Sequence, residues 1–220
     1  MIFYDKINKK SGGACMKTIL FQGDSITDAN REDDDRVNFG LGTGYPLLVA
    51  ADFLKNRKGD FCFLNRGKSG DRVTDIYARI KEDIINLSPD YMSILVGVND
   101  VAHELTMQCG VDEEKYEKIF GMLIEEVKNA LPDIKIIILE PFVLKGTATQ
   151  EMWEQFSSEV KKRANAAKRV AEKYSLCFVP LQNLFDDVAS GGDTEYWSSD
   201  GIHPTIAGHQ IIKEELVKAI

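Results

Sequence analysis

Three residues of this 220-residue chain have the types and the spacing that an activated hydroxyl nucleophile requires. Ser25 lies in the segment Gly-Asp-Ser-Ile-Thr at residues 23–27, directly after the apolar run at residues 18–21. Asp200 and His203 lie three residues apart in the segment Asp-Gly-Ile-His-Pro, near the other end of the chain. A serine hydroxyl is a weak nucleophile and needs a general base, which a third group must orient. The three residues therefore predict acyl-transfer chemistry of the serine-hydrolase type.

Each of these residues also has an ordinary structural explanation. Asp24 or Ser25 can simply be the N-cap of a helix that follows a strand. His203 can be a turn histidine whose ring bonds to the backbone. The chain has three histidines, of which His103 could border the same site and His209 falls in the expected last helix. The nucleophile hypothesis therefore depends on other motifs lying near Ser25.

Two further motifs can supply hydrogen-bond donors to a developing oxyanion. Gly70 lies in the polar loop Asn-Arg-Gly-Lys-Ser-Gly-Asp at residues 65–71, where a glycine lets a backbone N–H approach a ligand closely. Asn99 lies in Gly-Val-Asn-Asp at residues 97–100, at the expected end of the third strand, and offers a side-chain amide. Donors of these two kinds stabilise oxyanions. A glycine turn and an Asx turn or helix cap explain each residue singly, but the joint occurrence of the motifs favours the functional interpretation.

The rest of the sequence predicts strands that alternate with helices. Short apolar runs at residues 18–21, 61–64, 91–96, 134–139 and 176–179 predict buried parallel strands. Segments with helical periodicity lie between them, at residues 45–57, 73–87, 113–131 and 151–174, and a last helix is expected from about residue 205 onwards. The pattern predicts a single α/β domain with three layers, α/β/α, and a five-stranded parallel sheet whose strand order stays open.

The motifs fall on one edge of this predicted sheet. Ser25, Gly70 and Asn99 follow the first, second and third strands, and the Asp200–His203 pair lies beyond the fifth. Ligands of open α/β sheets bind beyond the carboxyl ends of the strands. We therefore expect all five residues to gather at one site.

The four motifs, in this order, resemble those of the SGNH (GDSL-type) esterase/lipase superfamily, and the resemblance extends from about residue 16 to the end of the chain. It implies a flavodoxin-like fold and a carboxylic ester hydrolase with Ser25 as nucleophile, His203 as general base and Asp200 as its orienting acid. It further implies an oxyanion hole made of the N–H groups of Ser25 and Gly70 and the side-chain amide of Asn99. The implied mechanism needs neither a metal nor an organic cofactor.

Composition and charge indicate which partners and which cellular compartment to expect. The net charge of −8 argues against nucleic acid as a partner. No apolar run is long enough to span a membrane, and residues 1–15 do not resemble a signal peptide. We expect residues 1–15 to be an extension with little structure, residues 16–220 to be the catalytic domain, and the compartment to be cytoplasmic. The four cysteines have no metal-ligand spacing, and no metal site is predicted.

The substrate is less readable than the reaction. We assign Asp24, Trp197 and Phe142 to the substrate-binding region: Trp197 could stack on a sugar ring or prop the catalytic loop, and Phe142 could line an acyl pocket or pack in the core. The acidic residues 32–35 are expected in a solvated loop at the mouth of the site. We expect short-chain or acetyl esters, with acetylated carbohydrate as one candidate. The alternatives are a lysophospholipase or thioesterase and, more distantly, a non-catalytic flavodoxin-like binding module. The oligomeric state is not readable.

Overall fold

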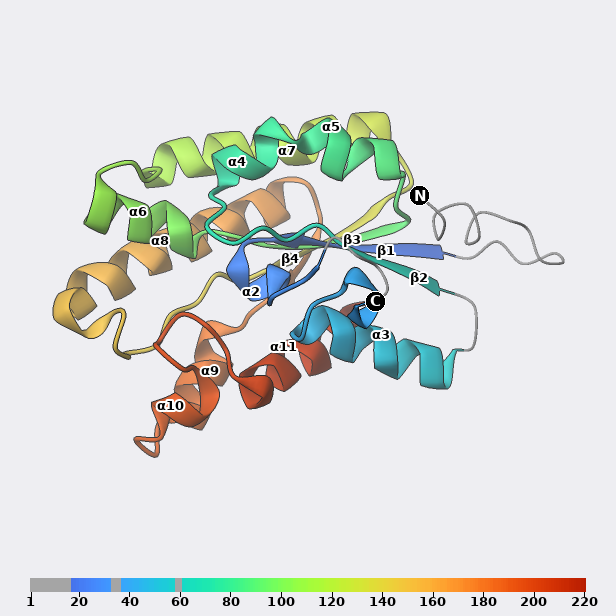
Figure 1. The fold of residues 1–220 in the computed structure, drawn as a ribbon. Helices are drawn as coiled ribbons and strands as arrows, with labels where there is room; N and C mark the ends of the chain where they lie inside the picture. The colour runs from blue at the N-terminus through green and yellow to red at the C-terminus, as the bar shows by residue number, and fades with distance from the viewer. Residues whose placement is uncertain (1–16, 33–36, 58–60) are drawn as a thin grey trace, which may run out of the picture.

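A computed structural model describes residues 17–32, 37–57 and 61–220 of the protein. These residues contain a five-stranded parallel sheet in the order β2-β1-β3-β4-β5 (Figure 1). The expected fold class is confirmed, and each expected strand matches an observed one to within two residues. The strands are β1 (Lys17–Gly23), β2 (Phe61–Asn65), β3 (Tyr91–Leu95), β4 (Lys135–Leu139) and β5 (Cys177–Val179).

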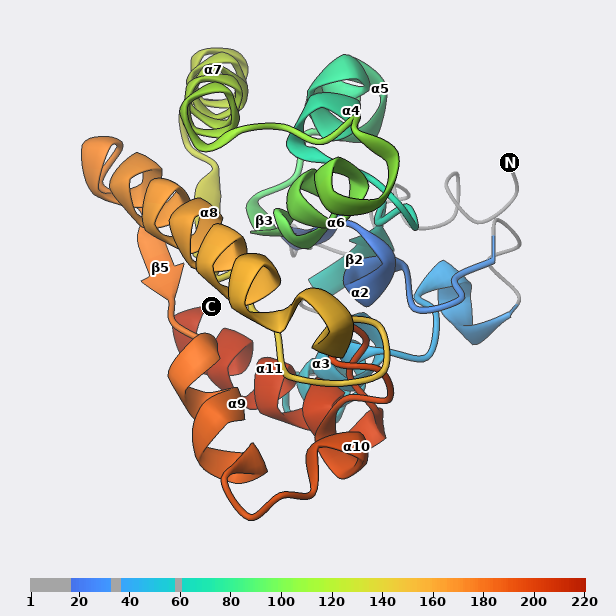
Figure 2. The same cartoon turned by 90° about the vertical axis from the view of Figure 1, so that its left-hand side faces the viewer.

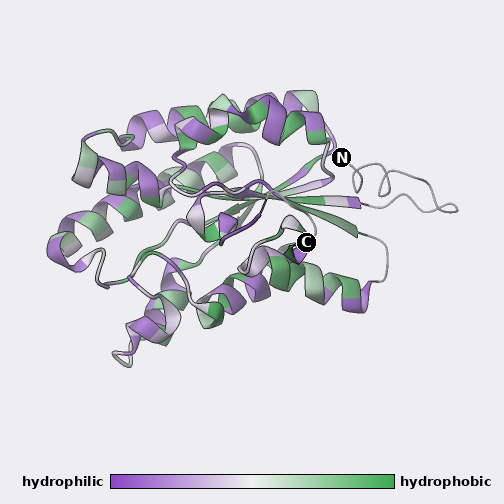
Figure 3. Cartoon of the chain, in the orientation of Figure 1, coloured by the Kyte–Doolittle hydropathy of each residue, from purple (hydrophilic) through white to green (hydrophobic). Residues whose placement is uncertain are grey.

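The central strands are apolar because both faces of the sheet are covered. Successive side chains of β1 point to opposite faces, so that Leu20 enters one hydrophobic core while Ile19 and Phe21 enter the other. Every residue of β3 is buried. Figure 3 shows hydrophobic residues running along the strands. A strand buried on both faces needs no polar alternation, which is why apolar runs predicted the strands correctly.

Helices cover the sheet on both sides and make three layers (Figures 1 and 2). On one side, α4 (Val73–Ala78), α5 (Ile80–Asp83), α7 (Glu113–Ala130) and α8 (Trp153–Lys173) contribute to the core that contains Leu20. On the other side, α3 (Tyr45–Asn56), α9 (Gln182–Ala189) and α11 (Ile206–Ala219) enclose the core that contains Phe21. The remaining helical segments are α2 (Ser25–Asp28), α6 (Val98–Met107), α10 (Thr194–Trp197) and the 3-10 turns η1 (Asn38–Gly40), η2 (Ile85–Leu87) and η3 (Gln150–Met152).

Helix boundaries differ from expectation near the sheet edge where the motifs gather. The helix expected at residues 73–87 is broken at Arg79, whose φ of −106° and ψ of 13° leave the α-helical range. Helices α6, α9 and α10 are additional to the expected set. As a result Asn99 lies in the first turn of α6 and not at the end of a strand. Gly97, with a φ of +138°, makes the turn from β3 into that helix.

Some expectations fall outside the described residues. The extension at residues 1–15 and the acidic residues 33–35 are among them, so both stay predictions. Within the described ranges, no helix combines the length and the apolar character that crossing a membrane requires.

Candidate active site

Ser25 is the first residue of α2, at a sharp turn off the end of β1. Gly23 ends the strand, and a Cβ at this position would lie 2.3 Å from the carbonyl oxygen of Leu95 and from Oγ1 of Thr27. Only a glycine fits between the neighbouring strand and the helix that follows. Asp24 then caps α2 by accepting a hydrogen bond of 3.0 Å from the N–H of Ile26. The turn therefore presents Ser25 at the carboxyl end of the sheet.

His203 bridges Ser25 and Asp200. Ser25 Oγ lies 2.9 Å from Nε2 of His203, and Nδ1 of the same ring lies 2.7 Å from Oδ2 of Asp200. A carboxylate only accepts hydrogen bonds, so Nδ1 carries the hydrogen, and Nε2 of the neutral ring is free to accept from the serine hydroxyl. The arrangement has the connectivity of a nucleophile, a base and the group that orients the base.

Asp200 is itself held by the loop that it shares with His203. Its Oδ1 accepts hydrogen bonds of 2.8 Å from the backbone N–H groups of Ile202 and His203. Burial raises the pKa of the Asp200 carboxyl, but these hydrogen bonds and the one from the His203 ring outweigh it, and the pKa lies below its usual range. Asp200 therefore stays ionised at neutral pH and keeps its hydrogen bond to the ring.

The loop from β2 to α4 is tied to the turn that carries Ser25. The N–H of Lys68 donates to the carbonyl oxygen of Gly23 at 3.0 Å. Ser69 donates to Oδ2 of Asp28 with both its N–H, at 2.9 Å, and its hydroxyl, at 2.6 Å. Gly70 follows in this loop with a φ of +85°, and among the described residues no atom beyond its two chain neighbours lies within 4 Å of the position that a Cβ would take. The loop thus holds Gly70 beside the α2 turn, with open space in front of it.

Asn99 joins this loop from α6. Its Nδ2 donates a hydrogen bond of 3.1 Å to the carbonyl oxygen of Asp71, the residue after Gly70. An amide nitrogen has two hydrogens, so one remains for a further acceptor. The structure therefore brings the sequence-predicted residues Ser25, Gly70, Asn99, Asp200 and His203 to one edge of the sheet.

The three residues assigned to the substrate-binding region are largely buried. Phe142 has no exposed surface, and its ring stacks on that of Phe185 with 4.0 Å between the centroids, so it packs in the core. Asp24 is only 1% exposed and lies beneath the turn. Trp197 is partly buried against the same core as Phe142, while Tyr196, in edge contact with it, is 57% exposed. Core packing accounts for the burial of Phe142 and Trp197, and capping of α2 accounts for the position of Asp24, while their assignment to substrate binding stays a prediction.

Asp24 and Asp100 are buried carboxyl groups whose pKa values lie well above the usual range. Burial raises the pKa of Asp24 to about 7, although the N–H of Ile26 opposes the rise. Burial likewise raises the pKa of Asp100 to about 7, although it accepts from the N–H of Val73 at 3.2 Å. The motif Gly-Val-Asn-Asp contains Asp100, but the sequence does not indicate that its carboxyl group is enclosed.

The other two histidines lie in the helices α6 and α11. His209 lies within α11, and its Nδ1 accepts a hydrogen bond of 3.2 Å from the N–H of Tyr45. Burial lowers the pKa of His209 to about 4, with a smaller contribution from His203. His103 is half-buried on α6. Within the described ranges, no group of three or more His, Cys, Asp or Glu side chains is arranged to hold a metal ion.

Comparison with known proteins yields closely related sequences and structures. Residues 21–211 match the GDSL-like Lipase/Acylhydrolase family. The chain is 31% identical over 211 residues to the acetylxylan esterase of Geobacillus stearothermophilus, a match that covers 92% of this chain and 93% of that protein. A crystal structure of that esterase has a TM-score of 0.82 at 29% identity, over 94% of each chain.

A second solved structure, described as a GDSL-like lipase from Parabacteroides merdae, has a TM-score of 0.88 at 32% identity. It covers 96% of this chain and 98% of its own. Solved structures of the Geobacillus esterase also include catalytic mutants, in which an aspartate or a serine is replaced by alanine. The similarity to both proteins extends over nearly the whole chain.

Proposed function

The chain belongs to the GDSL-like lipase/acylhydrolase family, and we propose that it is a serine esterase that removes short acyl groups, acetyl above all, from a carbohydrate. The pair of hydrogen bonds that runs from Ser25 through His203 to Asp200 carries the proposal. The membership itself makes the protein a carboxylic ester hydrolase. The acetyl and carbohydrate parts of the proposal are supported by the similarity to the acetylxylan esterase of Geobacillus stearothermophilus.

In the first half of the proposed reaction, Ser25 Oγ attacks the ester carbonyl carbon while Nε2 of His203 takes the hydroxyl proton. The carbonyl oxygen becomes an oxyanion, which accepts hydrogen bonds from the N–H groups of Ser25 and Gly70 and from Nδ2 of Asn99. The bond to the alcohol then breaks, and His203 returns its proton to the departing alkoxide. The acyl group stays on Ser25 as an ester.

In the second half, water replaces the alcohol. His203 takes a proton from the water as the water oxygen attacks the acyl-enzyme, and the same donors hold the second oxyanion. Collapse of this intermediate breaks the bond to Ser25 Oγ, which recovers its proton from His203. Throughout both halves, Asp200 holds the ring in one tautomer and stabilises the imidazolium that forms.

The proposal is tested by turnover of p-nitrophenyl acetate, butyrate and octanoate, together with acetate release from acetylated xylo-oligosaccharides. We expect preference for the acetyl esters and loss of this activity in Ser25→Ala and His203→Ala. Ser158→Ala is the matched control, because Ser158 is an exposed serine of α8 whose hydroxyl donates to the carbonyl oxygen of Gln155 in its own helix.

The other outcomes identify the alternatives. Preference for octanoate would replace the acetyl esterase with a lysophospholipase- or thioesterase-type acylhydrolase. Activity that survives both Ser25→Ala and His203→Ala would refute the proposed nucleophile and base. An absence of turnover with every ester would refute the proposed substrate class and favour a binding role.

A further inference from the structure

Asp71 adjoins two residues that supply proposed oxyanion-hole donors, Gly70 with its backbone N–H and Asn99 with its side-chain amide. It follows Gly70 directly, and its carbonyl oxygen accepts one hydrogen of the Asn99 amide. Its own N–H donates to the carbonyl oxygen of Lys68 at 3.1 Å, which closes the turn around Gly70. The position of Asp71 therefore fixes both the peptide plane next to Gly70 and the rotation of the Asn99 amide.

The carboxyl group of Asp71 is held by Arg79. Nη2 of Arg79 forms a hydrogen-bonded ion pair with Oδ2 of Asp71, and Nε of the same guanidinium donates to Oδ2 of Asp83 at 2.9 Å. The Asp71 side chain is only 7% exposed. Burial raises the pKa of the Asp71 carboxyl, and the guanidinium opposes the rise. Without Arg79, this buried carboxyl group would lose the cation that is bonded to it.

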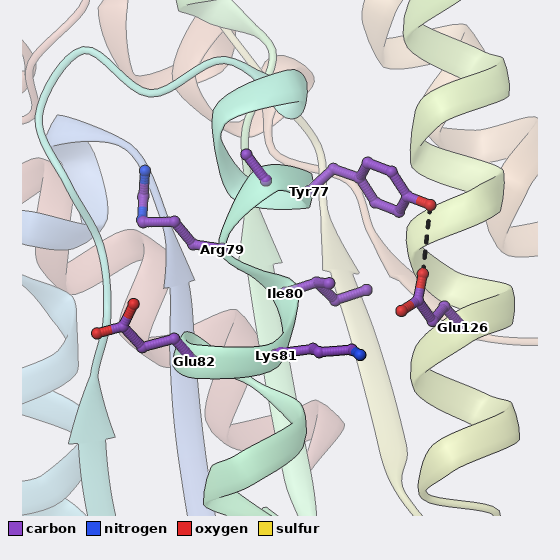
Figure 4. A pocket seen from close by; sticks show the side chains of 7 residues that line it. Tyr77, Arg79, Ile80, Lys81, Glu82 and Glu126 are labelled. Carbon is purple, nitrogen blue, oxygen red and sulfur yellow. Dashed lines mark hydrogen bonds between the residues drawn. The ribbon is translucent and has the colours of Figure 1, made fainter.

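The break between α4 and α5 occurs at Arg79. Arg79 lies at the junction of the two helices, outside the α-helical range. Figure 4 shows its side chain leaving the α4–α5 segment on the side away from Tyr77 and Glu126, which bond to each other. The break in the helix sets the direction in which the Arg79 side chain leaves the backbone. At this junction, the side chain reaches back to the loop that carries Gly70.

We propose that Arg79 is a positioning residue for the oxyanion hole, which it orders by clamping Asp71 between Gly70 and Asn99. The inference rests on the proposed function, because it assigns Arg79 a task only if Gly70 and Asn99 bind the oxyanion. Arg79 acts on these donors through the Asp71 carboxyl group. A donor is effective only where its hydrogen already points at the position of the oxyanion. A loosened loop therefore reduces the stabilisation of the transition state more than it reduces the affinity for the substrate.

The test compares Arg79→Met with Tyr77→Phe, the matched control, which removes a hydrogen bond of 3.2 Å from the opposite side of the same helical segment. With p-nitrophenyl acetate, we expect Arg79→Met to lower kcat by roughly 10- to 100-fold while KM changes by less than about 3-fold. Tyr77→Phe should leave both constants near their wild-type values. Arg79→Lys keeps the charge near Asp71 and should recover part of the lost kcat.

A double-mutant cycle separates positioning from general damage to the fold. In an Asn99→Ala background, Arg79→Met should lower kcat by a clearly smaller factor than in the wild type, because one of the two donors that Arg79 positions is already gone and only Gly70 still depends on it. Equal losses of kcat in both backgrounds, or an unchanged kcat in Arg79→Met, would overturn the inference. If Arg79→Met does not fold, Asp71→Asn provides the same comparison, since it keeps the side-chain shape and removes the charge.

Failure of the inference is distinguishable from failure of the proposed function. If Asn99→Ala lowers kcat and Arg79→Met does not, the oxyanion hole stands and the role of Arg79 is refuted. If Asn99→Ala leaves kcat unchanged, the proposed oxyanion hole is refuted together with the role of Arg79. Ser25→Ala, measured in parallel, reports on the nucleophile alone.

Discussion

The buried carboxyl group of Asp24 makes the stability of the protein depend on pH in a direction opposite to that of an ordinary ion-paired aspartate. Burial raises the pKa of Asp24 from 3.8 to about 7. In the unfolded chain, the same group is exposed and has its ordinary pKa. Between about pH 4 and about pH 7, the folded protein therefore keeps a proton that the unfolded chain has released. Raising the pH through this window favours unfolding.

The size of the effect follows from the change in pKa. Each pKa unit corresponds to about 1.4 kcal/mol, so Asp24 should lower the free energy of unfolding by up to roughly 4 kcal/mol, and the loss should be complete above pH ~7. Asp100 contributes with the same sign. His209 has the opposite effect, because its pKa is lowered from 6.5 to about 4: raising the pH through this range increases the free energy of unfolding. The comparison of wild type with Asp24→Asn isolates the Asp24 contribution, since the introduced amide keeps an oxygen that can accept from the Ile26 N–H.

The measurement is urea unfolding of wild type and Asp24→Asn from about pH 4 to about pH 8. We expect similar stabilities near pH 4 and an advantage of the variant that grows to roughly 4 kcal/mol near pH 8. Asp112→Asn is the control: Asp112 is an exposed N-cap whose pKa is lowered by the N–H of Lys115, so its effect should be constant above about pH 5. A difference between wild type and Asp24→Asn that does not change with pH would refute the reasoning.

Three further predictions concern single residues. Phe142→Ala removes a ring that stacks on Phe185 and should lower the free energy of unfolding in urea by about 3–5 kcal/mol, while kcat/KM of the folded enzyme for p-nitrophenyl acetate stays unchanged. Asp200→Asn should lower kcat by about 10⁴ with little change in thermal unfolding temperature, because the ring loses its orienting carboxylate; an activity near that of wild type would contradict the proposed role. Gly70→Ala should lower the free energy of unfolding in the same urea assay by about 1–2 kcal/mol and should also lower kcat, because the φ of +85° is unfavourable for alanine even though there is space for its Cβ. Gly191→Ala is the control, since its site is equally open but has no positive φ, and it should change neither quantity.

The gathering of the motif residues at one edge of the sheet was predictable from short motifs. Ser25, Gly70 and Asn99 each follow an apolar run, and the carboxyl ends of parallel strands share one edge of a sheet. This geometric rule is what allowed residues 178 positions apart, Ser25 and His203, to be predicted as neighbours. The prediction needed only the type and order of the elements, and it did not need the strand order.

The connections at that edge were less predictable. The helix expected at residues 73–87 is interrupted at Arg79, where the side chain pairs with Asp71. Hydrophobic periodicity reports which residues face a core, and it carries no information about an ion pair between a helix junction and a distant turn. Asn99 was expected at the end of a strand for a similar reason. The apolar run that predicted β3 ends at Val96, and α6 begins directly after the turn at Gly97, so Asn99 falls in a helix that apolar runs did not predict.

The fold class, the order of the motifs and the chemistry that their residue types allow could all be predicted from the sequence alone. The stacking of Phe142 in the core, the burial of Asp24 next to Ser25 and the ion pair of Arg79 with Asp71 could be seen only in the folded protein. Residue type and spacing follow from the local chain, and they are enough to place strands and helices. Burial and charge pairing depend on side chains contributed by several elements at once, and they exist only after those elements have packed together.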